Sequence, residues 1–162
     1  MSNLLEDLKD LETIEKFVQL EAAYDAQGIR YVRFSTKRFT IEQQALYAQG
    51  RFELNYVNDL RIKAGLYLLS PKENTYTVTN CDGIKYKSQH QYGNAVDYVI
   101  LNKLKNPTWD YVKYCSEYRA LRDIGTALGF NCGGSWMKQS NGKDSPYSNV
   151  DLGWDPPHIQ VG

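Results

Sequence analysis

The sequence predicts a single α+β domain, with a small mixed or antiparallel sheet flanked by helices. Two long stretches, 4–26 and 109–128, place apolar residues at helical spacing. Short β-forming runs occupy separate parts of the chain between and after these stretches, as in α+β domains. The length of 162 residues suits one domain with a substantial core, so we expect residues 1–162 to form one unit.

The first half of the chain predicts two helices and a strand. Residues 4–26 carry leucines and other apolar residues three and four apart, which predicts an N-terminal helix. Residues 29–35 alternate and are rich in β-formers, which predicts a strand. A second helix is expected after Thr40, which could cap it together with Gln43, and this helix should end near Gly50.

The second half predicts three strands and a helix before a long loop. Residues 95–101 are the clearest strand, residues 83–88 are expected to pair with them, and residues 75–80 also read as a strand. Residues 109–128 form an amphipathic helix that ends at glycine. The Gly-, Ser- and Asn-rich stretch 131–153 predicts a loop, and a short strand closes the chain.

Composition and charge exclude several classes of protein. Lys+Arg and Asp+Glu balance at 19 each, so charge gives no reason to expect nucleic-acid or membrane binding. The three cysteines form no CxxC pair, which argues against a disulfide framework or a cysteine zinc cluster. The N-terminus lacks the basic and apolar regions of a signal peptide, and no apolar run reaches the roughly 20 residues of a membrane span. We therefore expect synthesis in a reducing cytoplasm.

Only two histidines are present, and one of them lies close to an aspartate. We expect a loop that carries His90, a turn at Gly93 and a strand that carries Asp97. An imidazole and a carboxylate brought together suit zinc, and a third protein ligand would leave a position for water. Taken alone, the pair is weak evidence, because a histidine and an aspartate seven residues apart often occur by chance.

The other histidine follows two prolines. Proline fixes the backbone, so the segment can hold Asp155 and His158 in a set relation. In polyproline II geometry residues three apart lie about 9 Å apart along the axis, so sharing one water requires a kinked turn, for which a cis proline is one route. In this hypothesis His90, Asp97 and His158 hold zinc, the zinc lowers the pKa of its water toward roughly 7, and Asp155 transfers the proton. The alternative is a surface turn with two ordinary polar residues.

Four stretches of the sequence resemble the motifs of one family. SxHxxGxAxD at residues 88–97 and WDxPH at residues 154–158 resemble the two zinc-binding motifs of the D-alanyl-D-alanine carboxypeptidase and L-alanyl-D-glutamate peptidase family. That family includes the vancomycin-resistance dipeptidases and many bacteriophage endolysins, and it shares its fold with the hedgehog signalling domain. RFTIEQQALYAQGR at residues 38–51 and LGFNCGGSW at residues 128–136 resemble further family segments, and all four motifs follow the family order within residues 29–160.

The resemblance implies a hedgehog/DD-peptidase-like fold and a role for each motif residue. It implies that His90, Asp97 and His158 bind one zinc ion and that Asp155 is the catalytic base. An aspartate at this position, where the dipeptidases have glutamate, favours the endolysin branch. Arg38 matches the arginine that stabilises charge developing on the scissile carbonyl, which suits a permanently charged guanidinium.

The resemblance leaves two residues and one loop open. Gln43 and Ser88 match positions near the site, where they either contact substrate or serve as a helix cap and a supporting hydrogen bond. Some relatives regulate activity through calcium near the loop 137–152, which here contains Asn141, Asp144, Asn149 and Asp151. The alternative is a plain polar loop, because the spacing is not that of an EF-hand.

The function that follows is a zinc-dependent peptidase that hydrolyses a peptidoglycan stem-peptide bond, most readily L-Ala–D-Glu. We expect a monomeric phage endolysin, made in the host cytoplasm and released through a holin, with zinc as its cofactor and a regulatory Ca²⁺ ion as an open option. One alternative is a D-Ala-D-Ala dipeptidase or carboxypeptidase with the same zinc chemistry. Another is a cell-wall binding module that keeps zinc but does no chemistry.

Overall fold

A four-stranded antiparallel sheet forms the centre of the protein, whose computed structural model describes all 162 residues. The strand order is β1-β2-β4-β3, and all three neighbouring pairs are antiparallel. The strands are β1 (Tyr31–Ser35), β2 (Ala95–Ile100), β3 (Phe130–Cys132) and β4 (His158–Val161). Helices accompany this sheet, so the predicted α+β class is confirmed, and the sheet is antiparallel throughout.

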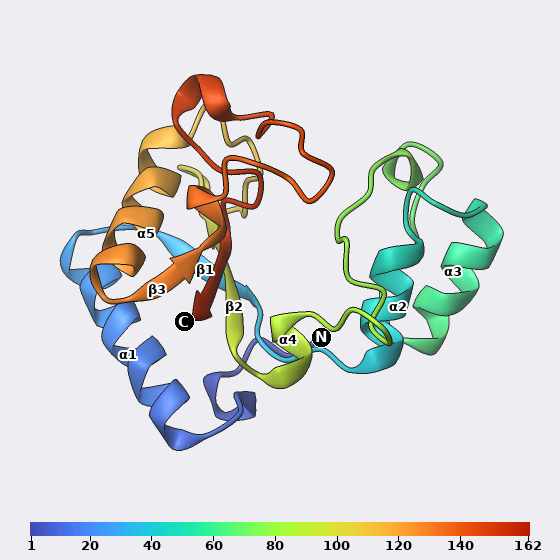
Figure 1. Cartoon of the computed structure of the whole chain (residues 1–162), viewed down its shortest axis with the longest axis horizontal. Coiled ribbons are helices and arrows are strands. Elements are labelled where there is room, and N and C mark those ends of the chain that lie inside the picture. The colour runs from blue at the N-terminus through green and yellow to red at the C-terminus, as the bar shows by residue number, and fades with distance from the viewer.

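Two long helices, α1 (Leu11–Ala26) and α5 (Cys115–Ala127), pack with one face of the sheet (Figure 1). Every residue of β2 is buried, so both faces of this strand are covered. Alternate residues of a strand point to the same face. Val96, Tyr98 and Ile100 accordingly join the core that α1 and α5 supply, and the side chains between them project to the opposite face.

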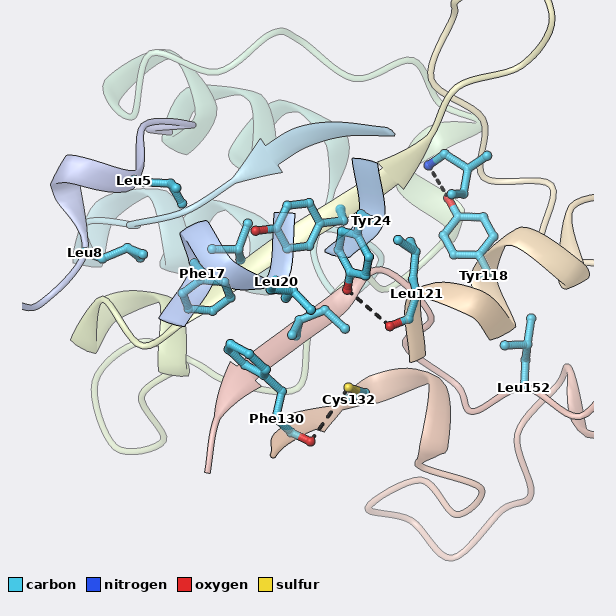
Figure 2. Close-up of a cluster of buried hydrophobic side chains, with 14 residues drawn as sticks. Leu5, Leu8, Phe17, Leu20, Tyr24, Tyr118, Leu121, Phe130, Cys132 and Leu152 are labelled. Atoms are coloured by element: carbon cyan, nitrogen blue, oxygen red, sulfur yellow. Dashed lines mark hydrogen bonds between the residues drawn. The ribbon is translucent and has the colours of Figure 1, made fainter. Parts of the chain in front are cut away.

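The main core joins α1, α5 and the sheet, as Figure 2 shows. Phe17, Leu20 and Tyr24 lie three and four residues apart on α1 and are fully buried. The Tyr24 hydroxyl donates a hydrogen bond to the Leu121 carbonyl of α5 over 3.1 Å, so the buried phenol has a partner. Burying each such large side chain contributes about 1.5–3 kcal/mol.

The N-terminal helix is shorter than the sequence predicts. A 3-10 turn, η1 (Leu5–Asp7), precedes α1, and α1 begins only at Leu11. The Asp10 side chain accepts a hydrogen bond from the Thr13 backbone N–H over 2.8 Å and so caps the helix. The helical spacing of residues 4–8 therefore reflects burial of η1 against the core rather than one continuous helix.

Residues 40–80 form a lobe that lies to one side of the sheet in Figure 1. We call it the α2–α3 lobe, after α2 (Thr40–Ala48) and α3 (Leu54–Lys63); its last helical element is the 3-10 turn η2 (Glu73–Thr75). The lobe has its own small buried cluster, composed of Ala48, Val57 and Leu69. None of the helices in the protein is both long and apolar enough to cross a membrane.

Two predicted strands and one predicted cap are wrong. Residues 75–80 and 83–88 form no strand, and β2 pairs instead with β1 and β4. The Asp82 carboxylate accepts hydrogen bonds from the backbone of Ile84 and Tyr86, both over 2.9 Å, and these local bonds satisfy groups that a strand partner would otherwise take. At the start of α2, Glu42 accepts from the Phe39 backbone N–H over 2.7 Å, in place of the predicted Thr40–Gln43 cap.

Other element boundaries also differ from the prediction. The helix predicted over 109–128 begins at Cys115, because residues 111–114 form turns. The loop predicted over 131–153 contains two 3-10 turns, η3 (Gly133–Ser135) and η4 (Ser148–Val150). The final strand is confirmed and includes His158.

Candidate metal centre and catalytic site

The strand register brings two candidate metal ligands together. Asp97 on β2 lies directly opposite His158 on β4, and Ser35 on β1 lies opposite Asp97 on its other side. Directly opposed residues of an antiparallel pair project to the same face, with Cβ atoms about 4.5–5.5 Å apart. Asp97 and His158 therefore meet on the face of the sheet that points away from the α1–α5 core.

His90 reaches the same place from a single helical turn, α4 (Gln89–Tyr92). The Ser88 hydroxyl caps this turn by accepting from the His90 backbone N–H over 3.3 Å. Gly93 ends the turn with φ +71°, and a Cβ there would lie 2.7 Å from the Lys9 backbone nitrogen, so only glycine fits. The predicted turn at Gly93 and strand at Asp97 are confirmed, while His90 lies on a helical turn rather than in a loop.

The three side chains form a triangle of ligand atoms. His90 Nε2 lies 3.1 Å from Asp97 Oδ1 and 3.2 Å from His158 Nδ1, and the last two atoms lie 3.3 Å apart. Ligands about 2.0–2.1 Å from a tetrahedral zinc ion lie about 3.3 Å from one another. The donor types and the spacing both fit zinc, and the three side chains are buried.

Neighbouring residues set which nitrogen of each histidine faces the triangle. His90 Nδ1 lies 2.6 Å from the Thr36 carbonyl, and His158 Nε2 lies 2.9 Å from the Gln160 side-chain oxygen. Because these partners only accept, each of the two nitrogens carries the proton, and the nitrogen in the triangle keeps a free lone pair. Burial lowers the pKa of His90 to about 4, with a further contribution from Arg38, so this imidazole is neutral at pH 7.

Arg38 holds the second oxygen of Asp97. Its Nη2 donates to Asp97 Oδ2 over 2.5 Å, its Nε donates to Ser35 Oγ over 3.0 Å, and its Nη1 donates to Gln43 Oε1 over 3.4 Å. Burial alone would raise the pKa of Asp97, but its interactions with His90 and Arg38 and its hydrogen bonds with both histidines outweigh burial and hold that pKa well below its usual range. Asp97 is therefore an ionised ligand whose orientation is fixed by an ion pair.

Gln43 and Ser88 lie beside the site with most of their polar atoms already bonded. Gln43 is fully buried, and its amide donates to Thr79 Oγ1 over 3.0 Å and to the Cys81 carbonyl over 2.9 Å. Ser88 is 7% exposed and caps α4. Ser88 therefore caps α4, and Gln43 bonds to Arg38, Thr79 and Cys81 instead of capping α2. Contact of either residue with substrate stays a prediction.

Asp155 lies next to the triangle but is not one of the three clustered ligands. Its carbonyl accepts a hydrogen bond from the His158 backbone N–H over 3.1 Å, which closes the predicted turn, and every peptide bond in the chain is trans. Burial raises the pKa of Asp155 to about 6; repulsion from Asp97 adds to this effect, while His158 and Arg38 oppose it. A carboxyl with such a pKa can accept and release a proton near neutral pH.

Two glycines hold the Asp155 turn in place. A Cβ on Gly133 would lie 2.2 Å from the Asp155 carbonyl oxygen, and a Cβ on Gly153 would lie 2.2 Å from the Gly133 carbonyl oxygen. The Gly153 N–H donates to the Gly134 carbonyl over 2.6 Å. Backbone therefore packs directly on backbone here, which fixes Asp155 relative to His158.

Sequence patterns assigned no role to several residues that support the site. Gln160 orients His158, and the two residues lie two apart on one strand, so the period of β4 could have indicated it. Trp136 packs against His158 with ring centroids 5.2 Å apart and against Trp154 at 5.4 Å. Thr36 acts through its backbone carbonyl, which no side-chain pattern reveals.

The loop near residues 137–152 does not support the calcium expectation. His90, Asp97 and His158 form the one cluster of three or more ligand-type side chains in the protein. In the loop, Asp144 pairs with Lys138, and Asp151 pairs with Arg122 over 3.3 Å. These carboxylates have lysine and arginine partners and do not converge on a common point.

The fold and the site define a class of protein. Two imidazoles and one carboxylate meet on the face of an antiparallel sheet, and a carboxyl of raised pKa lies beside them. Three protein ligands leave one zinc position for water or substrate, which is the arrangement of hydrolytic rather than structural zinc centres.

Comparison with known proteins identifies a family model that matches part of the sequence. Residues 82–145 match the family model described as D-alanyl-D-alanine carboxypeptidase, a segment that contains His90 and Asp97. No curated protein matches the sequence significantly. The match agrees with the family resemblance over the segment it covers, which includes the motif at residues 88–97.

Solved structures share the fold at low sequence identity. VanYB in complex with D-Alanine-D-Alanine is 16% identical with a TM-score of 0.50, covering 94% of this chain and 70% of that chain. A vancomycin resistance D,D-pentapeptidase VanY in complex with Zn(II) is 17% identical with a TM-score of 0.49, covering 94% and 71%. The Serratia marcescens L-Ala D-Glu endopeptidase ChiX is 16% identical with a TM-score of 0.48, covering 98% and 83%. The likeness to VanYB is one of fold.

Proposed function

We propose that this protein is a zinc-dependent peptidase that cleaves a peptidoglycan stem peptide, at the L-Ala–D-Glu bond. The observation that carries the proposal is the triangle of His90, Asp97 and His158 with Asp155 beside it. When bound, zinc supplies a Lewis acid and an activated water. The match to the carboxypeptidase family model supports a cell-wall peptide as the substrate class.

The protein's own residues transfer the proton and orient the metal ligand. Asp155 accepts a proton from the attacking water and returns it to the leaving amine, a role that suits its raised pKa. Arg38 keeps Asp97 ionised and oriented, as its contacts indicate. We further propose that Arg38 stabilises charge on the scissile carbonyl, as the family resemblance implies.

A second candidate bond is D-Ala–D-Ala, which the description of the matching family model favours. Asp155, in place of glutamate, favours the L-Ala–D-Glu bond and the endolysin branch. The endolysin role, with synthesis in a host cytoplasm, release through a holin and a monomeric state, stays a prediction from that resemblance. A binding module without chemistry is the weakest candidate, because a pure binder needs no carboxyl of raised pKa beside the metal ligands.

Mass spectrometry of digested peptidoglycan tests the proposal, because the new termini identify the cleaved bond. We expect a new D-Glu amino terminus and an L-Ala carboxyl terminus. His90→Ala provides the matched control, and it should lose both the zinc and the cleavage. Release of D-Ala alone would establish the second candidate, and an intact stem peptide after digestion with zinc-loaded protein would overturn both.

A further inference from the structure

The α2–α3 lobe carries a groove that the proposed chemistry does not use. The groove has a volume of about 230 Å³, is partly open to solvent and is lined mainly by hydrophobic residues. We call it the aromatic groove, because Tyr47, Phe52 and Tyr56 supply its rings, and Gln44 and Asp82 supply its polar groups. Phe52 and Tyr56 are 52% and 53% exposed, so two aromatic rings face solvent on this lobe.

Contacts around the aromatic groove hold its rings in place. The Arg51 guanidinium lies 4.1 Å from the centre of the Tyr47 ring, and Arg51 also donates to the Tyr47 carbonyl over 2.7 Å. The rings of Phe52 and Tyr56 pack together with centroids 5.4 Å apart at 58°. A binding surface whose side chains are already ordered loses little entropy when a ligand arrives.

The chemistry of the lining selects the kind of ligand. No lysine or arginine lines the groove, and the nearby Arg51 guanidinium lies against the Tyr47 ring, so the lining itself supplies no cation for an anion. The Asp82 carboxylate has a lowered pKa, because the backbone N–H groups of Tyr86 and Ile84 donate to it, so it stays ionised as an acceptor. Aromatic faces beside an acceptor and an amide suit a neutral ring that has apolar C–H faces and hydroxyl donors at its edge, which describes a sugar.

The groove is small and partly open to solvent. A volume of about 230 Å³ falls below the roughly 300–1,000 Å³ of sites for drug-sized ligands. A partner helix has a diameter of about 10–12 Å and needs a long apolar trough. A single sugar ring is the occupant that agrees with both the volume and the lining.

The aromatic groove and the candidate metal centre share a wall. Gln44 lines the groove, and its neighbour Gln43 accepts a hydrogen bond from Arg38 of the site. Gly83, between two groove residues, packs so closely on Gln43 that a Cβ there would lie 3.1 Å from the Gln43 side chain. The segment 82–84 therefore borders both the aromatic groove and the surroundings of the candidate metal centre.

We propose that the aromatic groove binds a neutral amino-sugar ring of the peptidoglycan glycan strand. This inference rests on the proposed function, and it deepens that function by adding the sugar to the substrate. The L-Ala–D-Glu bond is one residue removed from the sugar, whereas the terminal D-Ala–D-Ala bond is three residues further, or about 10 Å in an extended chain. A sugar site that shares a wall with the metal centre therefore favours the bond nearer the sugar.

Titration with the N-acetylglucosamine disaccharide, followed by amide NMR shifts, tests the groove without any catalysis. We expect shifts at the amides of the groove in the full chain, and affinity about tenfold weaker in Tyr56→Ala, the usual scale for loss of an aromatic anchor. Tyr76→Ala is the control, because Tyr76 lies in the same lobe, is 61% exposed and does not line the groove. Equal affinity in Tyr56→Ala and the wild type, or no shifts at the groove, would overturn the proposal.

Kinetics provide a second test that separates this inference from the proposed function. The zinc-loaded protein should cleave a disaccharide-linked stem peptide with a lower KM than the same free peptide, and Tyr56→Ala should remove that difference while Tyr76→Ala keeps it. A preference that survives Tyr56→Ala would overturn the sugar site. If neither peptide is cleaved, the proposed function fails, and the titration still decides the groove.

Discussion

Two carboxylates occupy the candidate site in opposite electrostatic settings. Asp97 faces Arg38 and two histidines, which hold its pKa well below the usual range. Asp155 is half-buried and has no arginine in contact, and its pKa is raised to about 6. When the pKa values of two neighbouring carboxyl groups shift in opposite directions in this way, one group serves as a fixed charge and the other as a proton carrier. We therefore separate Asp97 as ligand from Asp155 as base.

Asp155→Asn tests this separation. The amide keeps the size of the side chain but cannot accept the proton, so turnover should fall by about 10²–10⁴ while zinc content and melting temperature stay near wild type. Stem-peptide cleavage, metal analysis and thermal melts measure these quantities. Asp151→Asn, at a carboxylate paired with Arg122 on the surface, should leave turnover unchanged. Loss of zinc from Asp155→Asn would make Asp155 a ligand instead.

Arg38→Lys tests whether Arg38 does more than hold Asp97. A lysine can still pair with Asp97 as a point charge, so zinc should stay bound, but it cannot reproduce the planar fork. Loss of one donor to the transition state should lower kcat by about 10²–10³. Arg33→Lys is the control, because Arg33 lies away from the site, where it pairs with Glu21 at a distance of 3.2 Å. Near wild-type turnover would limit Arg38 to a structural role.

At the scale of elements, local pattern predicts a segment well when tertiary contacts agree with it. The stretch 95–101 is apolar almost throughout, and β2 is buried on both faces. The stretch 83–88 also alternates, with Ile84 and Tyr86 on one side, but both residues are exposed and their backbone bonds to Asp82. Alternation alone cannot tell a strand from a turn that a nearby carboxylate holds.

The turn that carries Asp155 depends on glycine, which gives a prediction at this scale. In Gly153→Ala the new Cβ would collide with the backbone of Gly133 and Trp136, which cannot move as a flexible side chain could. We expect a loss of about 3 kcal/mol in the free energy of unfolding, at the upper end for overpacking, measured by urea denaturation. Gly142→Ala is the control.

The control separates crowding from backbone strain. Gly142 has φ +80° and open space around it, so its alanine variant should lose only the strain of about 1–2 kcal/mol. Gly153→Ala should also lower cleavage, because the Asp155 turn shifts. Equal losses in the two variants would show that the Gly133–Gly153 contact is not tight.

At the scale of the whole molecule, the site joins parts of the chain that are distant in sequence. His90 lies on α4, Asp97 on β2 and His158 on β4. The motifs predicted these three residues, since each carries its own local signal. They could not predict that Asp97 and His158 are opposed in the sheet or that Gln160 orients His158, because register follows from packing of the complete chain.

Removing the metal tests whether zinc stabilises the fold by linking these distant segments of the chain. A ligand that binds only the folded state at 100 times its Kd stabilises the protein by about 2.7 kcal/mol. For a chain of this length each kcal/mol raises the melting temperature by about 2–4 °C, so zinc should raise it by roughly 5–10 °C over chelator-treated protein. His90→Ala removes one of the three ligands, so its melting temperature should be the same in zinc and in chelator. A wild type indifferent to zinc would contradict a metal centre, and a shift that persists in His90→Ala would place the metal elsewhere in the molecule.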